Sequence, residues 1–150
     1  IKPVFGYIER VELPDMHITL PAKLDTGAQT ASLNAVNISL EVYKGKHIVH
    51  FSVPHHGELI PFTMPCQGFV RIKQRREEHL SSPLKRKGFA TRPLVQLTVV
   101  LGSQEKKVLV NLTNRSKFDY PLLLGREAIS EFGGLVEPSQ TYLLSEPKGT

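Results

Sequence analysis

The sequence predicts an all-β fold, a small closed barrel or a sandwich, in a single domain over residues 1–150. Three observations lead to this prediction. Apolar residues recur with period two far more often than with the helical period. The short apolar runs are separated by turns rich in glycine and proline, of which the chain has 11 each. The length of 150 residues is typical of one domain that can bury a core of its own.

The expected elements follow from these runs and turns. One short helix is predicted over 126–132, because Gly133-Gly134 stops it. The clearest hairpin joins 93–101 to 106–112 through Gly102-Ser103. Between residues 57 and 70 we expect short strand pieces broken by Pro61 and Pro65. The other predicted strands are 4–13, 17–24, 31–42, 47–53, 122–124 and 135–144.

A basic loop is predicted at about residues 71–92. Its residues 71–88 carry a charge of +5, equal to the whole formal net charge, because basic and acidic residues balance in the rest of the chain. One interpretation is a landing site for an anionic partner, and the other is a solvated loop that keeps the chain soluble. No aromatic residue stands between Arg71 and Lys87, so nucleic acid is an unlikely partner: single-stranded bases would have nothing to stack on. The basic residues are Arg71, Lys73, Arg75, Arg76, Lys85, Arg86 and Lys87.

Several classes of protein are excluded or disfavoured. With 40% hydrophobic and 22% charged residues the chain is neither collagen-like nor of low complexity. A single cysteine allows no internal disulfide, and no apolar run approaches the ~20 residues of a membrane span. The sequence has no phosphate-binding glycine loop and no His-Glu-x-x-His helix, so we expect no cofactor and no metal.

Two weaker constellations remain as alternatives. A zinc site from His50, His55, Cys66 and His79 is conceivable, although the histidines are better explained as surface residues. Cys66 is either a nucleophile working with a histidine or, as is more usual for a lone cysteine, a small apolar filler.

The sharpest motif is the turn at Asp25-Thr26-Gly27, which follows an apolar strand. Gly27 permits close approach of the backbone, so amide N–H groups can donate to the Asp25 carboxylate. Thr26 supplies a hydroxyl that can brace the loop. The tripeptide alone is weak evidence, because Asp before Gly is also common in structural turns.

Further blocks of sequence strengthen the functional interpretation of the Asp25 turn. Residues 22–35, beginning Ala-Lys-Leu-Asp-Thr-Gly-Ala, are followed by Arg92-Pro93-Leu94-Val95, by residues 111–116 and by Tyr120 to Arg126, which contains Leu-Leu-Leu-Gly-Arg. Together these blocks resemble the retropepsin-like aspartic proteases, and among them the bacterial RimB family, the protease partner of RimK-type glutamate ligases. The resemblance runs from about residue 6 to residue 136.

This resemblance implies a small closed barrel that works as a homodimer, with one catalytic Asp25 from each subunit. Aspartic protease chemistry needs two carboxylates about 3 Å apart that share a proton, and this chain has one Asp-Thr-Gly. A two-fold symmetric dimer supplies the pair. The expected supporting residues are Thr26, Gly27, Ala28, Leu123, Leu124 and Gly125.

Two positions depart from the family pattern. Gln29 stands where retroviral enzymes often have an acid, which puts a pairing with Arg126 in question, and Asn34 stands where related sequences often have histidine. The extra length lies in the segment from Cys66 to Arg92, where a flap over the substrate is expected.

Three arginines within the resembling blocks are candidate substrate-binding residues: Arg92, Arg115 and Arg126. They either bind carboxylates of an acidic peptide or form ordinary structural ion pairs. The first hypothesis is therefore an aspartic endopeptidase acting on peptides, with acidic or poly-glutamate peptides as candidates. The alternative is a non-catalytic barrel that binds an acidic peptide or RNA through the basic loop. A soluble bacterial protein is expected. Because residue 1 is Ile1, both cytoplasm and periplasm stay open.

Overall fold

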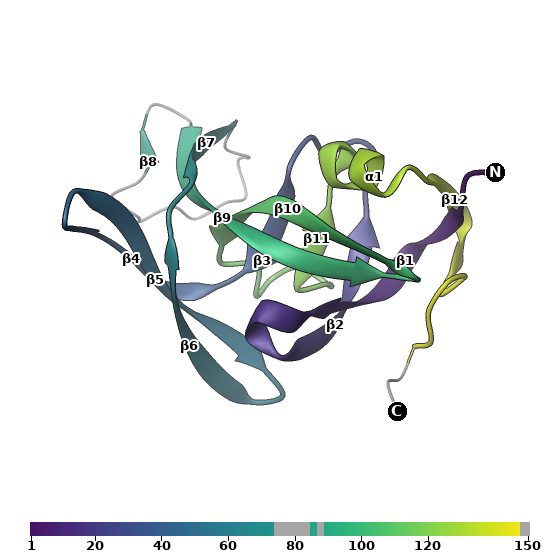
Figure 1. The fold of residues 1–150 in the computed structure, drawn as a ribbon, viewed down its shortest axis with the longest axis horizontal. Helices are drawn as coiled ribbons and strands as arrows, with labels where there is room; N and C mark the ends of the chain where they lie inside the picture. Colours follow the sequence, from purple (N-terminus) through teal and green to yellow (C-terminus); the bar gives the residue numbers. More distant parts are fainter. Residues whose placement is uncertain (74–84, 87–88, 148–150) are drawn as a thin grey trace.

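Two β-sheets make up the computed structural model, which describes residues 1–73, 85–86 and 89–147 (Figure 1). The larger is a mixed sheet of nine strands and the smaller is an antiparallel sheet of three, β4-β5-β6. The strands are β1 (Val4–Leu13), β2 (Ile18–Leu24), β3 (Ala31–Asn34), β4 (Val36–Tyr43), β5 (Lys46–His55), β6 (Glu58–Pro65), β7 (Gly68–Lys73), β8 (Lys85–Arg86), β9 (Phe89–Leu101), β10 (Gln104–Thr113), β11 (Leu122–Leu124) and β12 (Leu135–Thr141). The helical elements are the 3₁₀ turn η1 (Pro14–Met16) and the helix α1 (Arg126–Phe132).

The larger sheet closes into a barrel, as predicted. Six of its strands follow the order β1-β2-β11-β3-β10-β9, and β9 returns to β1 through the pair Glu12 and Val100. Alternation along the strands fills the interior. In β2, for example, Ile18, Leu20 and Leu24 are buried, and in β9 every second residue from Val95 is buried. The closed barrel with one short C-terminal helix is the architecture that the sequence indicates.

The position of β11 determines what surrounds the Asp25 turn. This three-residue strand lies between β2 and β3, parallel to β2 and antiparallel to β3. Residues 25–30 connect β2 to β3, so they must cross the end of the inserted strand at Leu124. The buried side chains of Leu122 and Leu124 hold β11 in the core. The two sequence blocks that carry the resemblance are thereby brought together.

The smaller sheet shares the hydrophobic core of the barrel. Val49, Phe51 and Val53 project from one face of β5 into the same cluster as the barrel residues. Phe51 packs on Phe62 of β6 with a ring-centroid distance of 5.8 Å. In Figure 1 the long ribbons of β4, β5 and β6 curve away from the barrel on the side opposite α1 and the termini.

The expectation of one strand over 31–42 was wrong. The chain leaves the barrel at Ala35, whose N–H donates to the carbonyl oxygen of Thr113, and β4 then joins the other sheet. The expectation that Pro61 breaks its segment was also wrong, because β6 is continuous over Glu58–Pro65. Among the described strands β6 pairs with β5 alone, and an edge strand tolerates a proline that cannot donate to a neighbour.

The predicted basic loop begins and ends in paired strands. Arg71 in β7 pairs with Thr91 in β9, and Lys73 pairs with Phe89. Lys85 and Arg86 form β8, which also pairs with β9. Arg75, Arg76 and Lys87 lie outside the described residues, as does His79. Where the chain is described, its helical segments are too short and too polar to cross a bilayer.

Candidate active site

The Asp25 turn is fixed by its own backbone and by β11. The N–H of Asp25 donates to the carbonyl oxygen of Leu124 at 2.9 Å, which extends the ladder between β2 and β11 by one residue. The N–H of Gly27 donates to Oδ1 of Asp25 at 2.9 Å, and the N–H of Ala28 donates to the Asp25 carbonyl at 3.2 Å. Asp25 is half-buried, whereas Thr26 and Gly27 are exposed. The turn therefore presents its carboxylate and its tip at the surface of the chain.

The following loop caps α1. Gly125 precedes this helix and has no capping side chain, so the first N–H groups need other acceptors. Arg126 N–H donates to the carbonyl of Ala28 at 2.7 Å, and Glu127 N–H donates to that of Gln29 at 3.2 Å. A Cβ at Gly125 would lie 2.8 Å from the Ala28 oxygen, closer than real contacts allow. The loop that follows Asp25 and the start of α1 are therefore in direct backbone contact, and Gly125 has no room for a side chain there.

The side chain of Gln29 forms a hydrogen bond with Glu127 and not with Arg126. Its Nε2 donates to Oε1 of Glu127 at 2.9 Å. Arg126 is exposed, and its guanidinium donates to the Gly27 carbonyl at the long distance of 3.5 Å. The Gln29 side chain therefore contacts a carboxylate on the first turn of α1. Leu123, between two buried leucines, is half-buried.

A buried polar network lies next to this loop on β3 and β10. Asn111, only 1% exposed, accepts a hydrogen bond at Oδ1 from the Ser32 hydroxyl at 2.8 Å. Its Nδ2 donates to the hydroxyl of Thr30 at 3.1 Å. The same Oδ1 accepts from the guanidinium of Arg92 on β9 at 3.4 Å. The network connects the residue before β3 to the strand that carries Arg92.

Arg115 is a buried cation near Asp25. It is 7% exposed, and its backbone N–H donates to Oδ1 of Asn34 at 2.6 Å. Its guanidinium lies 4.3 Å from the ring centre of Phe118. The pKa of Arg115 is lowered from its ordinary value to about 10: burial lowers it most, the positive charge of Arg92 also lowers it, and the negative charge of Asp25 opposes the decrease. Asp25, Arg92 and Arg115 are therefore close enough to interact electrostatically.

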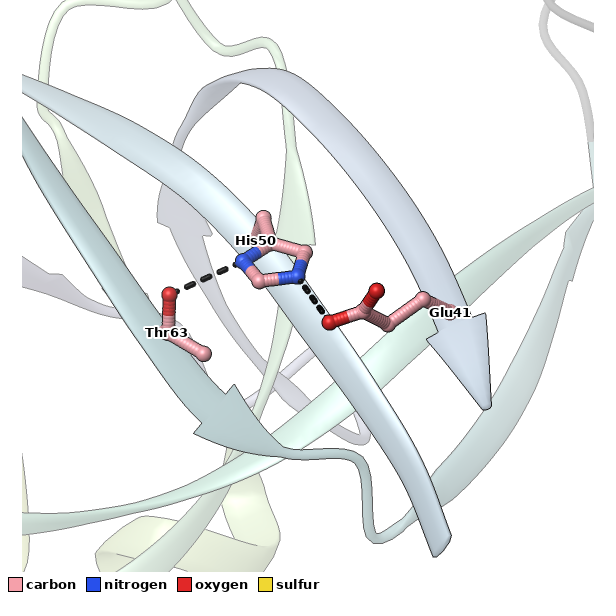
Figure 2. Close-up of polar contacts among 3 residues, drawn as sticks. All are labelled: Glu41, His50 and Thr63. Atoms are coloured by element: carbon pink, nitrogen blue, oxygen red, sulfur yellow. Dashed lines mark hydrogen bonds and ion pairs between the residues drawn. The ribbon is translucent and has the colours of Figure 1, made fainter. Parts of the chain in front are cut away.

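A second constellation of hydrolase-like residues lies on the smaller sheet (Figure 2). His50 Nδ1 is 2.9 Å from the Thr63 hydroxyl, and His50 Nε2 is 2.7 Å from Oε1 of Glu41. The three residues come from the three neighbouring strands β6, β5 and β4. The His50 and Glu41 side chains are 40% and 51% exposed, so water surrounds the pair. Its geometry is that of a polar link across the strands.

The other candidates from the sequence are not assembled into sites. Sγ of Cys66 donates to the Gly68 carbonyl at 3.3 Å, and its side chain packs against the core. Over the residues for which placement is given, no three histidine, cysteine, aspartate or glutamate side chains form a group able to hold a metal. A cavity of about 310 Å³ between η1 and β6, lined by Asp15, Met64 and Lys107 among others, includes none of the predicted site residues.

The sequence reasoning missed the polar network. Asn111 and Asn34 lay within the resembling blocks, but neither was assigned a role. A signal was present, since asparagine is disfavoured inside strands and Asn111 stands between the apolar residues Val110 and Leu112 of a predicted strand. Glu9 was also missed: this carboxylate is fully buried in β1 and accepts N–H groups from Gly6 and Leu143.

Comparisons with known proteins point in one direction. The family model described as "Retropepsin-like aspartic endopeptidase RimB" matches residues 4–147. A solved structure from Legionella pneumophila, the protein Lpg0085 with unknown function (DUF785), is 40% identical with a TM-score of 0.75, covering 94% of this chain and 97% of that one.

Longer relatives contain a similar segment. Proteins named "Probable alpha-L-glutamate ligase" from Shewanella pealeana and Shewanella halifaxensis are each 30% identical over 146 residues. The match covers 97% of this chain but 30% of each of those proteins. The chain thus spans about a third of the length of these curated relatives.

Proposed function

Since the chain belongs to the RimB-like family of retropepsin-like aspartic endopeptidases, we propose that it hydrolyses peptide bonds as a homodimer with one Asp25 from each subunit. The observation that carries the proposal is the Asp25 turn itself. Its carboxylate is held by the Gly27 N–H and its base by Leu124, while the tip at Thr26 is exposed. An exposed tip can meet its symmetric copy, as the chemistry requires.

The two carboxylates have different roles in the proposed reaction. One Asp25 is ionised and takes a proton from a bound water, which attacks the carbonyl carbon of the peptide bond. The other is protonated and donates to the carbonyl oxygen. When the C–N bond breaks, the amine takes up a proton and the new carboxyl group retains the oxygen from water. Two carboxyl groups about 3 Å apart cannot both ionise, so the pair retains one proton.

The proposed substrates are acidic, glutamate-rich peptides. Three features support this class. The chain carries a formal net charge of +5, which attracts anionic peptides. Arg115 interacts electrostatically with Asp25 and with a second arginine, Arg92. Relatives that contain a similar segment are named as probable glutamate ligases, whose product would be rich in glutamate.

The test uses Asp25→Asn and a peptide of five α-linked glutamates between a fluorophore and a quencher. We expect Asp25→Asn to lose at least ~1,000-fold in hydrolysis, because the amide neither takes nor gives the shared proton. Its unfolding temperature should stay near that of the parent, because the amide oxygen still accepts from Gly27. Asp119→Asn, an exposed carboxylate outside the turn, is the matched control and should retain full activity.

Mixing experiments test the dimer directly. A large excess of Asp25→Asn added to a fixed amount of parent protein forms mixed dimers with a single carboxylate. Hydrolysis should then fall as the excess rises, because neither mixed nor doubly substituted dimers have the pair. Hydrolysis that is unaffected by the excess would refute the shared dimeric site, and an Asp25→Asn protein that cuts as fast as the parent would refute the role of Asp25. A parent protein that binds the peptide without hydrolysing it would favour a binding module.

A further inference from the structure

We infer that Arg115, supported by Arg92, forms a binding site for one carboxylate of the substrate, beside Asp25. The inference rests on the proposed function for the identity of the ligand, a peptide. It adds which residues recognise the acidic group and separates them from Arg126, the third arginine predicted from the sequence.

The first argument is a buried charge without a counterion. Arg115 is 7% exposed, and within the described part of the chain its Nε has no hydrogen-bond partner and no carboxylate forms a salt bridge with it. At neutral pH the group still carries its proton, because its pKa of about 10 lies well above that pH. A buried cation is normally paired, since removing it from water is costly. The missing partner is an anion.

The second argument is the neighbouring like charge. Arg92 lies close enough to lower the pKa of Arg115, and the amide of Asn111 accepts a hydrogen bond from Arg92. Asn111 is itself fixed by Ser32 and Thr30. The chain therefore uses buried side chains to hold two cations near each other, an arrangement that an incoming anion stabilises. Planar guanidinium groups suit a carboxylate particularly well, because they donate two parallel N–H groups.

The third argument is location. Asn34 holds the backbone of Arg115, and Phe118 lies under its guanidinium, so the side chain is positioned from two sides. Asp25 attracts Arg115 electrostatically without forming a salt bridge with it. A carboxylate bound at Arg115 would therefore belong to a peptide lying close to Asp25. Arg126 is exposed, and among the described residues its guanidinium donates only to the Gly27 carbonyl, at 3.5 Å, so it adds at most a screened attraction.

The experiment measures binding, so that it does not depend on cleavage. The protein is Asp25→Asn, and the probes are pentaglutamate, the same peptide with each glutamate changed to glutamine in turn, and pentaglutamate with an amidated C-terminus. We expect that only one of these single-carboxylate changes weakens binding, by roughly 10- to 100-fold, as the loss of one charge-assisted hydrogen bond would. A position in the glutamine scan identifies a side-chain carboxylate, and the amidated peptide identifies the terminal one.

When Arg115→Met is combined with Asp25→Asn, neutralising that one carboxylate of the peptide should no longer weaken binding. Arg115→Gln should have the same effect and replaces the methionine variant if that variant folds poorly. Lys117→Met, an exposed cation in the same turn, should keep the penalty for neutralising that carboxylate. The penalty should persist in 0.5 M NaCl, unlike attraction to an exposed basic surface. A penalty that survives in both neutral variants, or no single-carboxylate penalty in Asp25→Asn, would overturn the inference.

The two proposals fail separately. Hydrolysis that requires Asp25, without discrimination that requires Arg115, would refute only the carboxylate site. Discrimination that requires Arg115, in a protein that hydrolyses no peptide, would refute only the endopeptidase.

Discussion

The backbone N–H of Asp25 donates to the carbonyl oxygen of Leu124 across 2.9 Å, so the proposed catalytic turn is anchored to a strand from the far end of the sequence. The next residue, Gly125, lies against the carbonyl groups of Ala28 and Thr30. The turn, the strand and the first residues of α1 are thus one rigid backbone unit. Its geometry depends on a glycine that forms no hydrogen bond to the carboxylate.

Gly125→Ala tests this dependence. The new Cβ would lie 2.7 Å from the Thr30 carbonyl oxygen, so the loop or the helix must shift. We expect the free energy of unfolding to fall by about 1–3 kcal/mol, and hydrolysis to fall about 100-fold because Asp25 is displaced. Urea unfolding and peptide hydrolysis measure the two effects. Gly57→Ala is the control: nothing lies within 4 Å of its Cβ, so only the strain of φ +78° remains and hydrolysis should not change. Equal activity of the two variants would contradict the rigid unit.

Arg115→Met should make the protein more stable. At pH 8 the guanidinium is protonated in both the folded and the unfolded chain, so its burial costs free energy that methionine does not incur. We expect the free energy of unfolding to rise by roughly 1–3 kcal/mol. Arg126→Met removes the same charge at an exposed position and should change stability by less than ~0.5 kcal/mol.

The pH dependence of this difference has a definite sign. The pKa of Arg115 falls from its ordinary value to about 10 on folding, so between the folded and the unfolded pKa the unfolded chain binds more protons. Stability contributed by this group therefore rises with pH across that interval, and the advantage of Arg115→Met shrinks above pH 10. Thermal unfolding at fixed protein concentration at pH 8 and pH 10.5 measures it. A less stable Arg115→Met protein would show that the charge is already compensated.

Glu9→Gln should loosen the C-terminal segment. The buried carboxylate accepts N–H groups from Gly6 at 2.7 Å, from Leu143 at 2.9 Å and from Leu144 at 3.3 Å. With its oxygen in place of Oε2, glutamine keeps that acceptor, but its amide nitrogen then replaces Oε1 and faces the donors of Leu144 and Ser145, at a cost of about 1–3 kcal/mol. Amide hydrogen exchange at Leu143 and Leu144 should accelerate. Glu12→Gln, exposed on the same strand, should leave exchange unchanged; similar acceleration in both would rule out a specific role for Glu9.

Thr63→Val separates the two hydrolase-like constellations. It removes the hydroxyl that contacts His50 Nδ1 while keeping the β-branched shape. Because the contact is exposed, we expect a loss of stability below ~1 kcal/mol. Peptide hydrolysis should stay within about two-fold of the parent, against the loss expected for Asp25→Asn. A Thr63→Val protein without activity would assign the chemistry to His50 instead.

Much of the barrel could be predicted from local pattern. The strand Val4–Leu13 and the helix Arg126–Phe132 have the predicted bounds, because period-two alternation and the Gly133 stop are local signals. The break at Ala35 could not be predicted, since 31–35 are all buried and no glycine or proline marks the change of sheet. The pairing of β7 with β9 could not be predicted either, because it joins segments that are separated in the sequence and no local pattern specifies the partner strand.

The candidate site also has a part that sequence motifs predict and a part that depends on tertiary contacts. The Asp25 turn and the Leu-Leu-Leu-Gly block were identified from sequence, and the structure brings them into contact. The three arginines were equivalent in the sequence, and only burial separates Arg115 from Arg126. Burial of a charged residue depends on neighbours such as Asn34 and Phe118, which no local pattern specifies.

The insertion of β11 between β2 and β3 also has a consequence for biosynthesis. A ribosome delivers β2, the Asp25 turn and β3 long before Leu122–Leu124, so a nascent chain has an open seam where the last barrel strand belongs. Until that seam is filled, the turn has no anchor and α1 has no loop to cap it. In this order of assembly, the turn reaches its final geometry only after residues 122–124 have been synthesised and have paired with β2 and β3.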